Sequence, residues 1–297
     1  MMDTTTHALA VEPTLGGLLR TYSVEVTAKD RKGIDAAQQL CAPGTEVFVA
    51  NLPNDSMDRL VAACTTLGKA GLSAVPHMVA RNTASRAELD DTLARLVGEA
   101  GITRALILGG DRDDPVGPFD ASIQLIQTGL FEQHGLKKVA IGIHPETHPR
   151  VADEIMHPAQ PAKVREAEAR GLEVYLVSQF GFEPQPYIDM ARRLRADGLT
   201  NPIRIGVAGP TSTTKLIKFA LMCGVGASLR ALREKESLAG NMLSGETPEA
   251  LIGALAAAQA AEPALGFDSV HFFTFGALDK SVEFAEGLKR QGASAPL

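Results

Sequence analysis

Eight short runs of apolar and β-branched residues recur along the chain, and segments with helical spacing lie between them. Most runs are continuously apolar, which is typical of parallel strands covered on both faces. The alternation of strand and helix predicts parallel strands joined by right-handed crossovers. The predicted strands are Tyr22–Val26, Glu46–Leu52, Ala74–Val79, Arg104–Gly110, Lys138–His144, Glu173–Phe180, Pro202–Gly209 and Val270–Phe275.

Eight such units in about 280 residues predict an α/β fold, a closed (β/α)8 TIM barrel. An open doubly wound sheet is the alternative, but no GxGxxG fingerprint follows the first strand. We expect an N-terminal tail over residues 1–20 and one barrel domain over 21–292, with extra helices between Pro210 and Ser269. The predicted helices are Ser56–Gly68, Ser85–Gly98, Ser122–Gln133, Pro161–Arg170, Pro184–Ala196, Thr213–Cys223, Glu246–Ala260 and Lys280–Lys289.

Composition narrows the class of protein. The net charge of −6 disfavours binding to the phosphates of nucleic acid and to anionic membrane surfaces, so we expect neither a nucleic acid nor a membrane as a partner. Three scattered cysteines, no signal peptide and no apolar run long enough to cross a bilayer predict a cytoplasmic location. The apolar stretch Ala250–Ala260 fits a core helix or the interface of a homo-oligomer.

Polar side chains occur near the C-terminal end of every predicted strand, where TIM barrels build their active sites. Collectively this pattern predicts an active site at one mouth of the barrel. These residues are Glu25, Asn51, His77, Asp111, His144, Glu146, His148, Ser178, Gln179, Thr211, His271 and Thr274.

Three of these positions allow a catalytic and a structural interpretation. Glu25 interrupts an apolar strand, so it is either an ion-pairing group or a partly desolvated acid whose pKa is raised toward neutrality. Asp111 follows Gly109 and Gly110, which let backbone approach a flat ligand, but it could also cap a turn. His77 could serve the site or be a buried histidine bonded to a backbone carbonyl.

Two further motifs suggest other chemistry. His77, His144 and His148 could hold a metal in a barrel hydrolase, but His144–His148 lies on a proline-bounded loop rather than on a helix, so we assign no metal. Residues Gly206–Lys215 resemble a phosphate loop without matching GxxxxGK[ST]. They fit either an anion site at a helix start or a simple capped helix.

Six segments, in order along the predicted barrel, resemble the methylenetetrahydrofolate reductase family over residues 20–290. They are Tyr-Ser-Val-Glu25, Val-Pro-His77-Met, Leu-Gly-Gly-Asp111, His-Pro-Glu-Thr-His148-Pro, Ser-Gln179-Phe180 and His271-Phe-Phe-Thr274. Each motif is short, but the six in register are fairly specific. The chain resembles the short, catalytic-domain-only form of the family.

The resemblance implies reduction of 5,10-methylenetetrahydrofolate to 5-methyltetrahydrofolate by NADH or NADPH through bound FAD, a step of one-carbon metabolism that feeds methionine biosynthesis. Glu25 then matches the general acid, and Asp111 matches the aspartate that lies near the flavin and the pterin. Gln179 and Phe180 match substrate-binding positions. The positions that match flavin contacts, besides Asp111, are His77, Gly110, His144 and His148.

Departures from the family's pattern fall mainly on cofactor contacts. Gly109 replaces an arginine, His144 replaces a tyrosine, and Gly276-Ala277 replaces Asn-Arg. The stretch Lys163–Gly171 lacks a lysine at the usual spacing, so we expect a pyrophosphate contact to be missing. Direct hydride transfer from NAD(P)H without flavin is therefore the first alternative. A metal-dependent hydrolase and a folate- or nucleotide-binding protein without chemistry are the others.

Overall fold

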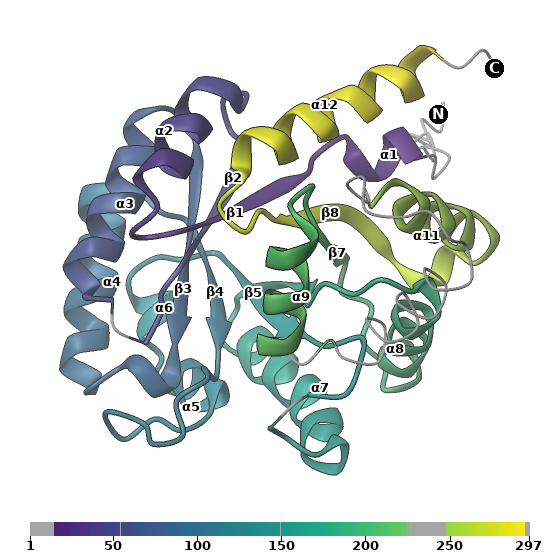
Figure 1. Cartoon of the computed structure of the whole chain (residues 1–297). Coiled ribbons are helices and arrows are strands. Elements are labelled where there is room, and N and C mark those ends of the chain that lie inside the picture. The colour runs from purple at the N-terminus through teal and green to yellow at the C-terminus, as the bar shows by residue number, and fades with distance from the viewer. Residues whose placement is uncertain (1–14, 54, 149, 224, 226–247, 295–297) are drawn as a thin grey trace, which may run out of the picture.

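The computed structural model describes residues 15–294 except 54, 149, 224 and 226–247, and its eight parallel strands close into a barrel (Figure 1). The predicted TIM barrel is therefore confirmed, with strand ends shifted by up to three residues. The strands are β1 (Ser23–Thr27), β2 (Glu46–Ala50), β3 (Ser73–Val79), β4 (Arg104–Leu108), β5 (Lys138–Ile143), β6 (Glu173–Ser178), β7 (Ile203–Ala208) and β8 (Phe267–Phe273).

The barrel closes where β1 pairs with β8, with Ser23 opposite His271 and Val24 opposite Phe272. Side chains alternate between the two faces of each strand. Val24 and Phe272 therefore pack outward in the large apolar core between the strands and the helices. Ser23 and His271 belong to the opposite, inward face, and this placement matters for the site.

Helices cover the outside of the barrel. They are α1 (Leu15–Leu19), α2 (Arg31–Leu40), α3 (Met57–Lys69), α4 (Arg86–Ala100), α5 (Ser122–Gln127), α6 (Leu130–Gln133), α7 (Asp153–Ala169), α8 (Pro184–Ala196), α9 (Thr213–Met222), α11 (Glu249–Ala261) and α12 (Leu278–Ser294), with the 3₁₀ turns η1 (Ala80–Asn82) and η2 (Pro263–Leu265). Between β7 and β8 the structure places α9, α11 and η2. Residues 1–14 of the predicted tail lie outside the described residues, and 15–19 form α1, which packs on α12 (Figure 1).

Side-chain caps fix several helix starts. Ser56 and Ser85 accept hydrogen bonds from the backbone N–H groups of Arg59 and Glu88, and the Glu88 carboxylate accepts from the N–H of Ala84, just before the cap. Each cap satisfies donors that have no partner within the helix. These helices begin within one residue of the predicted starts, because the capping signal is local.

Several helices differ from the sequence prediction, and α2, α5, α6 and α7 show why. Helix α2 was not predicted, because it buries only Gly33, Ile34 and Ala37. The predicted helix Ser122–Gln133 divides into α5 and α6 at Gly129, which adopts a φ of 74°. Helix α7 starts eight residues before the predicted Pro161 and runs through two prolines, since packing of its apolar face outweighs the local cost.

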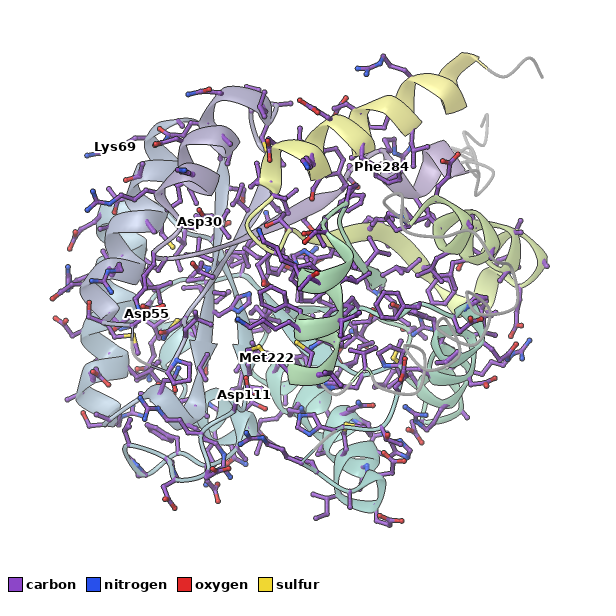
Figure 2. All side chains as sticks on the ribbon, viewed as in Figure 1. Asp30, Asp55, Lys69, Asp111, Met222 and Phe284 are labelled. Carbon is purple, nitrogen blue, oxygen red and sulfur yellow. The ribbon has the colours of Figure 1, made fainter. Side chains whose placement is uncertain are left out.

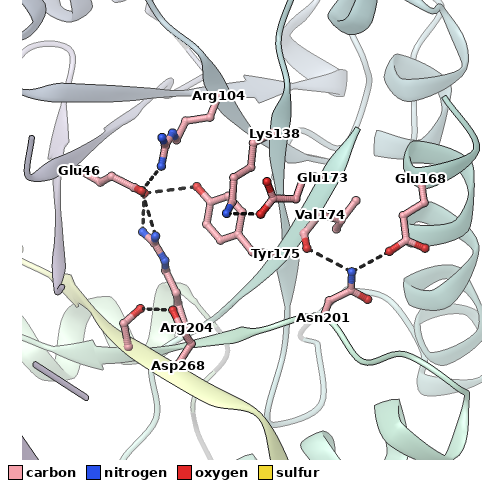
Figure 3. Close-up of polar contacts among 11 residues, drawn as sticks. Glu46, Arg104, Lys138, Glu168, Glu173, Val174, Tyr175, Asn201, Arg204 and Asp268 are labelled. Carbon is pink, nitrogen blue, oxygen red and sulfur yellow. Dashed lines mark hydrogen bonds and ion pairs between the residues drawn. The ribbon is translucent and has the colours of Figure 1, made fainter. Parts of the chain in front are cut away.

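A charged cluster closes the N-terminal end of the barrel interior (Figure 3). Glu46 accepts hydrogen bonds from Arg104 and Arg204, and the Arg204 guanidinium lies 4.6 Å from the centre of the Tyr175 ring. Burial alone would raise the pKa of Glu46, but the hydrogen bonds and charges of Arg204 and Arg104 outweigh it and lower the pKa. Above this cluster, Phe48, Val75, Leu106 and Val177 fill the barrel.

Within the described residues no helix is long and apolar enough to cross a membrane. Cys41, Cys64 and Cys223 are all free thiols, and the first two are buried.

Candidate active site

A cavity of about 490 Å³ lies at the C-terminal ends of the strands, within the range of roughly 300–1,000 Å³ typical of small-molecule sites. Six of the strands, η1, the loop after β4, α5 and α7 contribute to its wall. Asp111 is labelled in Figure 2 near the ends toward which the arrows of β3 and β4 point. The residues that line the cavity include nine that the sequence analysis singled out: Glu25, His77, Gly110, Asp111, His144, His148, Ser178, Gln179 and His271.

Glu25 projects into the cavity from β1 and is held between two imidazoles. His77 Nε2 on β3 lies 3.4 Å from Glu25 Oε2, and His271 Nε2 on β8 lies 3.7 Å from the same oxygen. The Glu25 side chain is 20% exposed, whereas those of His77 and His271 are 8% and 1% exposed. The carboxyl group is therefore the part of this cluster that a ligand can reach.

The prediction that the pKa of Glu25 is raised is wrong for the ligand-free protein. Burial acts in that direction, but the imidazoles of His271 and His77 beside the carboxyl group outweigh burial and lower the pKa. Burial also lowers the pKa of His77 to about 4, against the opposing effect of Glu25, so His77 is neutral at pH 7. The sequence alone could not predict the direction of this pKa shift, because both histidines are distant from Glu25 in the sequence and meet it only in the folded barrel.

Asp111 lies on the exposed loop after β4, and arginine side chains fix that loop. Arg81 Nη1 donates to the backbone carbonyls of Arg112 and Asp113, and Arg81 Nε donates to that of Asp120. Arg150 donates to the carbonyl of Asp111 itself. Gly110, before Asp111, has a φ of 102°, and a Cβ there would lie 2.5 Å from Val79 Cγ1. The loop therefore requires glycine and presents Asp111 in one conformation.

Gln179 and Phe180, adjacent in sequence, have different surroundings. Gln179 lines the cavity, and its side-chain Oε1 accepts a hydrogen bond from the N–H of Phe180, which leaves the amide nitrogen to face a ligand. The Phe180 ring is fully buried and packs on the rings of Phe182, Phe273 and Phe275. The structure does not place Phe180 in the cavity wall, so it does not support the predicted direct contact with substrate.

His144 and His148 lie together on the opposite side of the cavity from β1. Their rings are 4.7 Å apart and nearly perpendicular, and His148 Nδ1 accepts hydrogen bonds from the N–H groups of Arg150 and Val151. Burial, together with the charges of His148 and Lys163, lowers the pKa of His144 to about 3. Both positions are therefore suited to contact a neutral ring system.

The three histidines considered for a metal do not gather at one point. His77 faces Glu25, whereas His144 and His148 face each other. In the part of the chain that the structure describes, no group of three or more His, Cys, Asp or Glu side chains is arranged to hold a metal ion. The hydrolase alternative gains no support from these residues.

Sequence reasoning missed two cavity residues on α7. Lys163 lines the wall, and burial lowers the pKa of its ammonium group to about 8. Gln160 is 1% exposed, and neither polar atom of its side chain has a hydrogen-bond partner among the described residues. Spacing could have revealed them, because Met156, Gln160 and Lys163 recur at i, i+4 and i+7 on one helix face. The expectation that a pyrophosphate contact is missing from Lys163–Gly171 stays a prediction, but this stretch begins with a lysine that lines the cavity.

The loop that resembles a phosphate site leads into a capped helix. Ser212 Oγ accepts a hydrogen bond from the N–H of Lys215 at the start of α9. Of the two interpretations of residues Gly206–Lys215, the structure supports the capped helix.

Comparison with known sequences addresses the family. A sequence model described as methylenetetrahydrofolate reductase matches residues 52–234, which is more than half of the chain. The chain belongs to this family. Asp111, Gln179 and Lys163 lie inside the matched region of this methylenetetrahydrofolate reductase family member, whereas Glu25 and His271 lie outside it.

Solved structures of other barrel enzymes are similar to this family member only at low identity. The 2,3-dimethylmalate lyase of the PEP mutase/isocitrate lyase superfamily is 14% identical, with a TM-score of 0.49 over 95% of this chain and 89% of that one. Dihydropteroate synthase from Thermus thermophilus is 14% identical, with a TM-score of 0.45 over 90% and 93%. The 3-dehydroquinate dehydratase from Geobacillus kaustophilus is 11% identical, with a TM-score of 0.48 over 93% and 92%.

Proposed function

We propose that this protein reduces 5,10-methylenetetrahydrofolate to 5-methyltetrahydrofolate, with NADH or NADPH as the electron donor and FAD as the hydride carrier. Family membership supports the reaction class. The observation that carries the assignment is that Glu25, Asp111 and Gln179, which are far apart in the sequence, line one cavity at the barrel mouth.

Glu25 acts as the general acid in this proposal. Opening the methylene bridge requires a proton on the departing nitrogen, because protonation makes the attached carbon more electrophilic. In the ligand-free cavity the carboxyl group is ionised at neutral pH, since its pKa is lowered. A folate that covers the exposed fifth of the side chain removes water from it and so raises its pKa. Glu25 then binds a proton when substrate is present.

Asp111 and Gln179 position the pterin. Asp111 is an exposed carboxylate at the open side of the cavity, where it can accept hydrogen bonds from the N–H groups on the edge of a pterin. Gln179 offers an amide nitrogen as a donor from the end of β6. A carboxylate and an amide on different strands fix the orientation of a flat ring better than either could alone.

Several cavity residues have the chemistry that a dinucleotide cofactor requires. Leu106, Leu108 and Ile143 provide apolar surface for a ring system, and Lys163 provides a cation for a diphosphate. Gln160 adds a buried amide whose donor and acceptor are both without partners among the described residues. Bound FAD would supply the hydride, and these residues would hold it beside Glu25.

One observation favours a second candidate, direct transfer from NAD(P)H without flavin. Lys163 and Arg81 are the lysine and arginine among the described lining residues, and the backbone carbonyls of the β4 loop already engage Arg81. Within the described wall, Lys163 is therefore the cation that remains to bind a diphosphate, and it can bind one dinucleotide. Resident FAD would occupy Lys163 and leave no second cation in the described wall for NAD(P)H.

The purified full-length protein distinguishes the candidates. Its visible spectrum and anaerobic turnover with NADH, NADPH and methylenetetrahydrofolate are measured, and the 5-methyl product is identified by mass spectrometry. Flavin absorbance that NAD(P)H bleaches and the folate restores supports the FAD-dependent reaction. Colourless protein that forms the same product supports direct transfer. Protein that binds folate without forming product contradicts both and leaves the binding-protein alternative.

A further inference from the structure

Ser23 and His271 form a buried pair directly behind Glu25. Ser23 Oγ lies 2.9 Å from His271 Nδ1, across the register pair that closes the barrel. Both residues are 0% exposed. Because side chains alternate along β1, Ser23 and Glu25 lie on the same inward face of that strand, two residues apart. The imidazole of His271 thus lies between the two groups: it is hydrogen-bonded to the hydroxyl and faces the carboxyl group at 3.7 Å.

The surroundings of this pair leave one satisfactory arrangement of protons. A serine hydroxyl can donate or accept, whereas a neutral imidazole has one N–H and one acceptor nitrogen. If Nδ1–H donated to Ser23, the bare Nε2 would face the carboxylate oxygen 3.7 Å away. If Ser23 donates to Nδ1, the proton of His271 lies on Nε2 and points toward Glu25 Oε2. The second arrangement directs an N–H rather than a lone pair at the carboxylate, which is the electrostatically favourable choice at this distance.

Few other titratable or aromatic side chains surround the Glu25 carboxyl group in the described part of the chain. His77 from β3 and His271 from β8 both approach Oε2, and the charge of Glu25 also raises the pKa of Cys223, just after α9. The rings of Phe48 and Phe273 pack on His271 at centroid distances of 4.5 and 5.0 Å and confine it. Both imidazole contacts fall on Oε2, so the two carboxyl oxygens are not equivalent.

We propose that Ser23 fixes the Nε2–H tautomer of His271, which pins Glu25 through Oε2 and makes Oε1 the oxygen that carries the catalytic proton. Ser23 and His271 are positioning residues, and Glu25 remains the group that touches substrate. The proton reaches Oε1 from solvent in the cavity and leaves to the departing nitrogen, so His271 neither gains nor loses one. The catalytic consequence rests on the proposed function, whereas the tautomer does not.

The tautomer is tested first, on the ligand-free full-length protein with ¹⁵N-labelled histidine. We expect His271 to give the NMR signature of Nε2–H near pH 7. In Ser23→Ala we expect a mixture of tautomers. The control is Ser269→Ala, since Ser269 is a fully buried β8 serine that bonds Asp268 instead, and it should leave the His271 signals unchanged. A wild-type Nδ1–H tautomer, or a Ser23→Ala spectrum identical to wild type, would overturn the proposal without affecting the proposed function.

Kinetics then test the consequence. His271→Leu removes the donor but keeps an apolar side chain, so the pKa of Glu25 rises and the descending limb of the kcat profile should move to higher pH, with kcat falling at least tenfold. His271→Gln keeps an amide donor near the Nε2 position and should restore most of the wild-type profile. Equal pH profiles for the Leu and Gln variants would contradict the positioning role, because lost packing alone does not move a titration.

Discussion

The two ends of the barrel interior hold buried charges in opposite ways. At the N-terminal end Glu46 is matched by Arg104 and Arg204, with Tyr175 beside them (Figure 3). At the C-terminal end Glu25 has only two imidazoles among the described residues, one of them neutral at pH 7, and Lys163 lines the cavity with no ion pair in that part of the chain. Charge that is neutralised internally stabilises the barrel, whereas charge that is left unmatched is available to ligands.

Removing the carboxyl group of Glu25, the proposed general acid, should give the largest change in activity. Glu25→Gln keeps the shape and the contacts with the histidines but cannot donate a proton. We expect kcat to fall by about 10²–10⁴-fold, the usual contribution of a positioned acid. Stopped-flow anaerobic kinetics measure kcat, and calorimetry should show folate binding retained. Unchanged turnover would show that the acid assignment is wrong.

Removing the matched carboxylate at the other end should instead cost stability. Glu46→Gln removes the carboxylate that pairs with both Arg104 and Arg204 and leaves only Asp268 near Arg204, which costs about 3–5 kcal/mol in the free energy of unfolding. Urea denaturation measures this loss. Glu25→Gln is the matched control and should change the unfolding free energy much less, because no cation is left unpaired. Equal losses in the two variants would remove the distinction between the two ends.

Lys163 should control affinity for a diphosphate-containing ligand. Lys163→Met removes the cation, and we expect the Kd for NAD(P)H or ADP to rise by roughly tenfold, with little loss of stability. In the wild type the Kd should also rise as pH increases through about 8, because the ammonium group then loses its proton. Isothermal titration at several pH values measures both effects. Lys215→Met, at an exposed lysine on α9, is the control and should bind normally.

The lowered pKa of Lys163 also predicts how the free energy of unfolding changes with pH. Its folded-state pKa lies below the ordinary value of 10.5, so folding is opposed by the buried charge at low pH. The unfolding free energy of the wild type should therefore rise between about pH 8 and pH 10.5 relative to that of Lys163→Met. A pH-independent difference between the two proteins would show that Lys163 is paired.

Arg81 should give the smallest effect. Arg81→Lys loses the geometry that joins the carbonyls of Arg112, Asp113 and Asp120, while it keeps the charge. We expect faster amide exchange over residues 109–121 and a few-fold rise in KM, with kcat nearly unchanged. Hydrogen–deuterium exchange with mass spectrometry measures the loop. Unaltered exchange would show that Gly110 and Arg150 suffice to hold Asp111.

Local patterns predicted the barrel well. Eight apolar runs and the serine caps of α3 and α4 depend on neighbours within a few residues, so the sequence alone located them. Helix α2 is absent from the sequence prediction because its apolar face is short. Asp30 nevertheless caps it by accepting a hydrogen bond from the N–H of Gly33. The first eight residues of α7 are absent from the sequence prediction, because proline is normally excluded from a helix interior and this helix contains two.

The site was predicted less completely, for a physical reason. Polar residues at strand ends could be placed at one mouth, since parallel strands in a closed barrel share their C-terminal end. The substrate contact expected of Phe180 stays a prediction that the ligand-free structure does not support, because the ring packs on Phe273 and Phe275. Lys163 is absent from the predicted site residues, because only the folded structure shows that its side chain lines the cavity.

The sequence by itself determined the number of strands, their order and the end of the barrel at which polar groups collect, because these follow from periodicity and chirality along the chain. Only the tertiary structure decided the state of Glu25. Its pKa depends on the balance between burial and two histidines from β3 and β8, and that balance exists only once the barrel has closed and brought β8 beside β1.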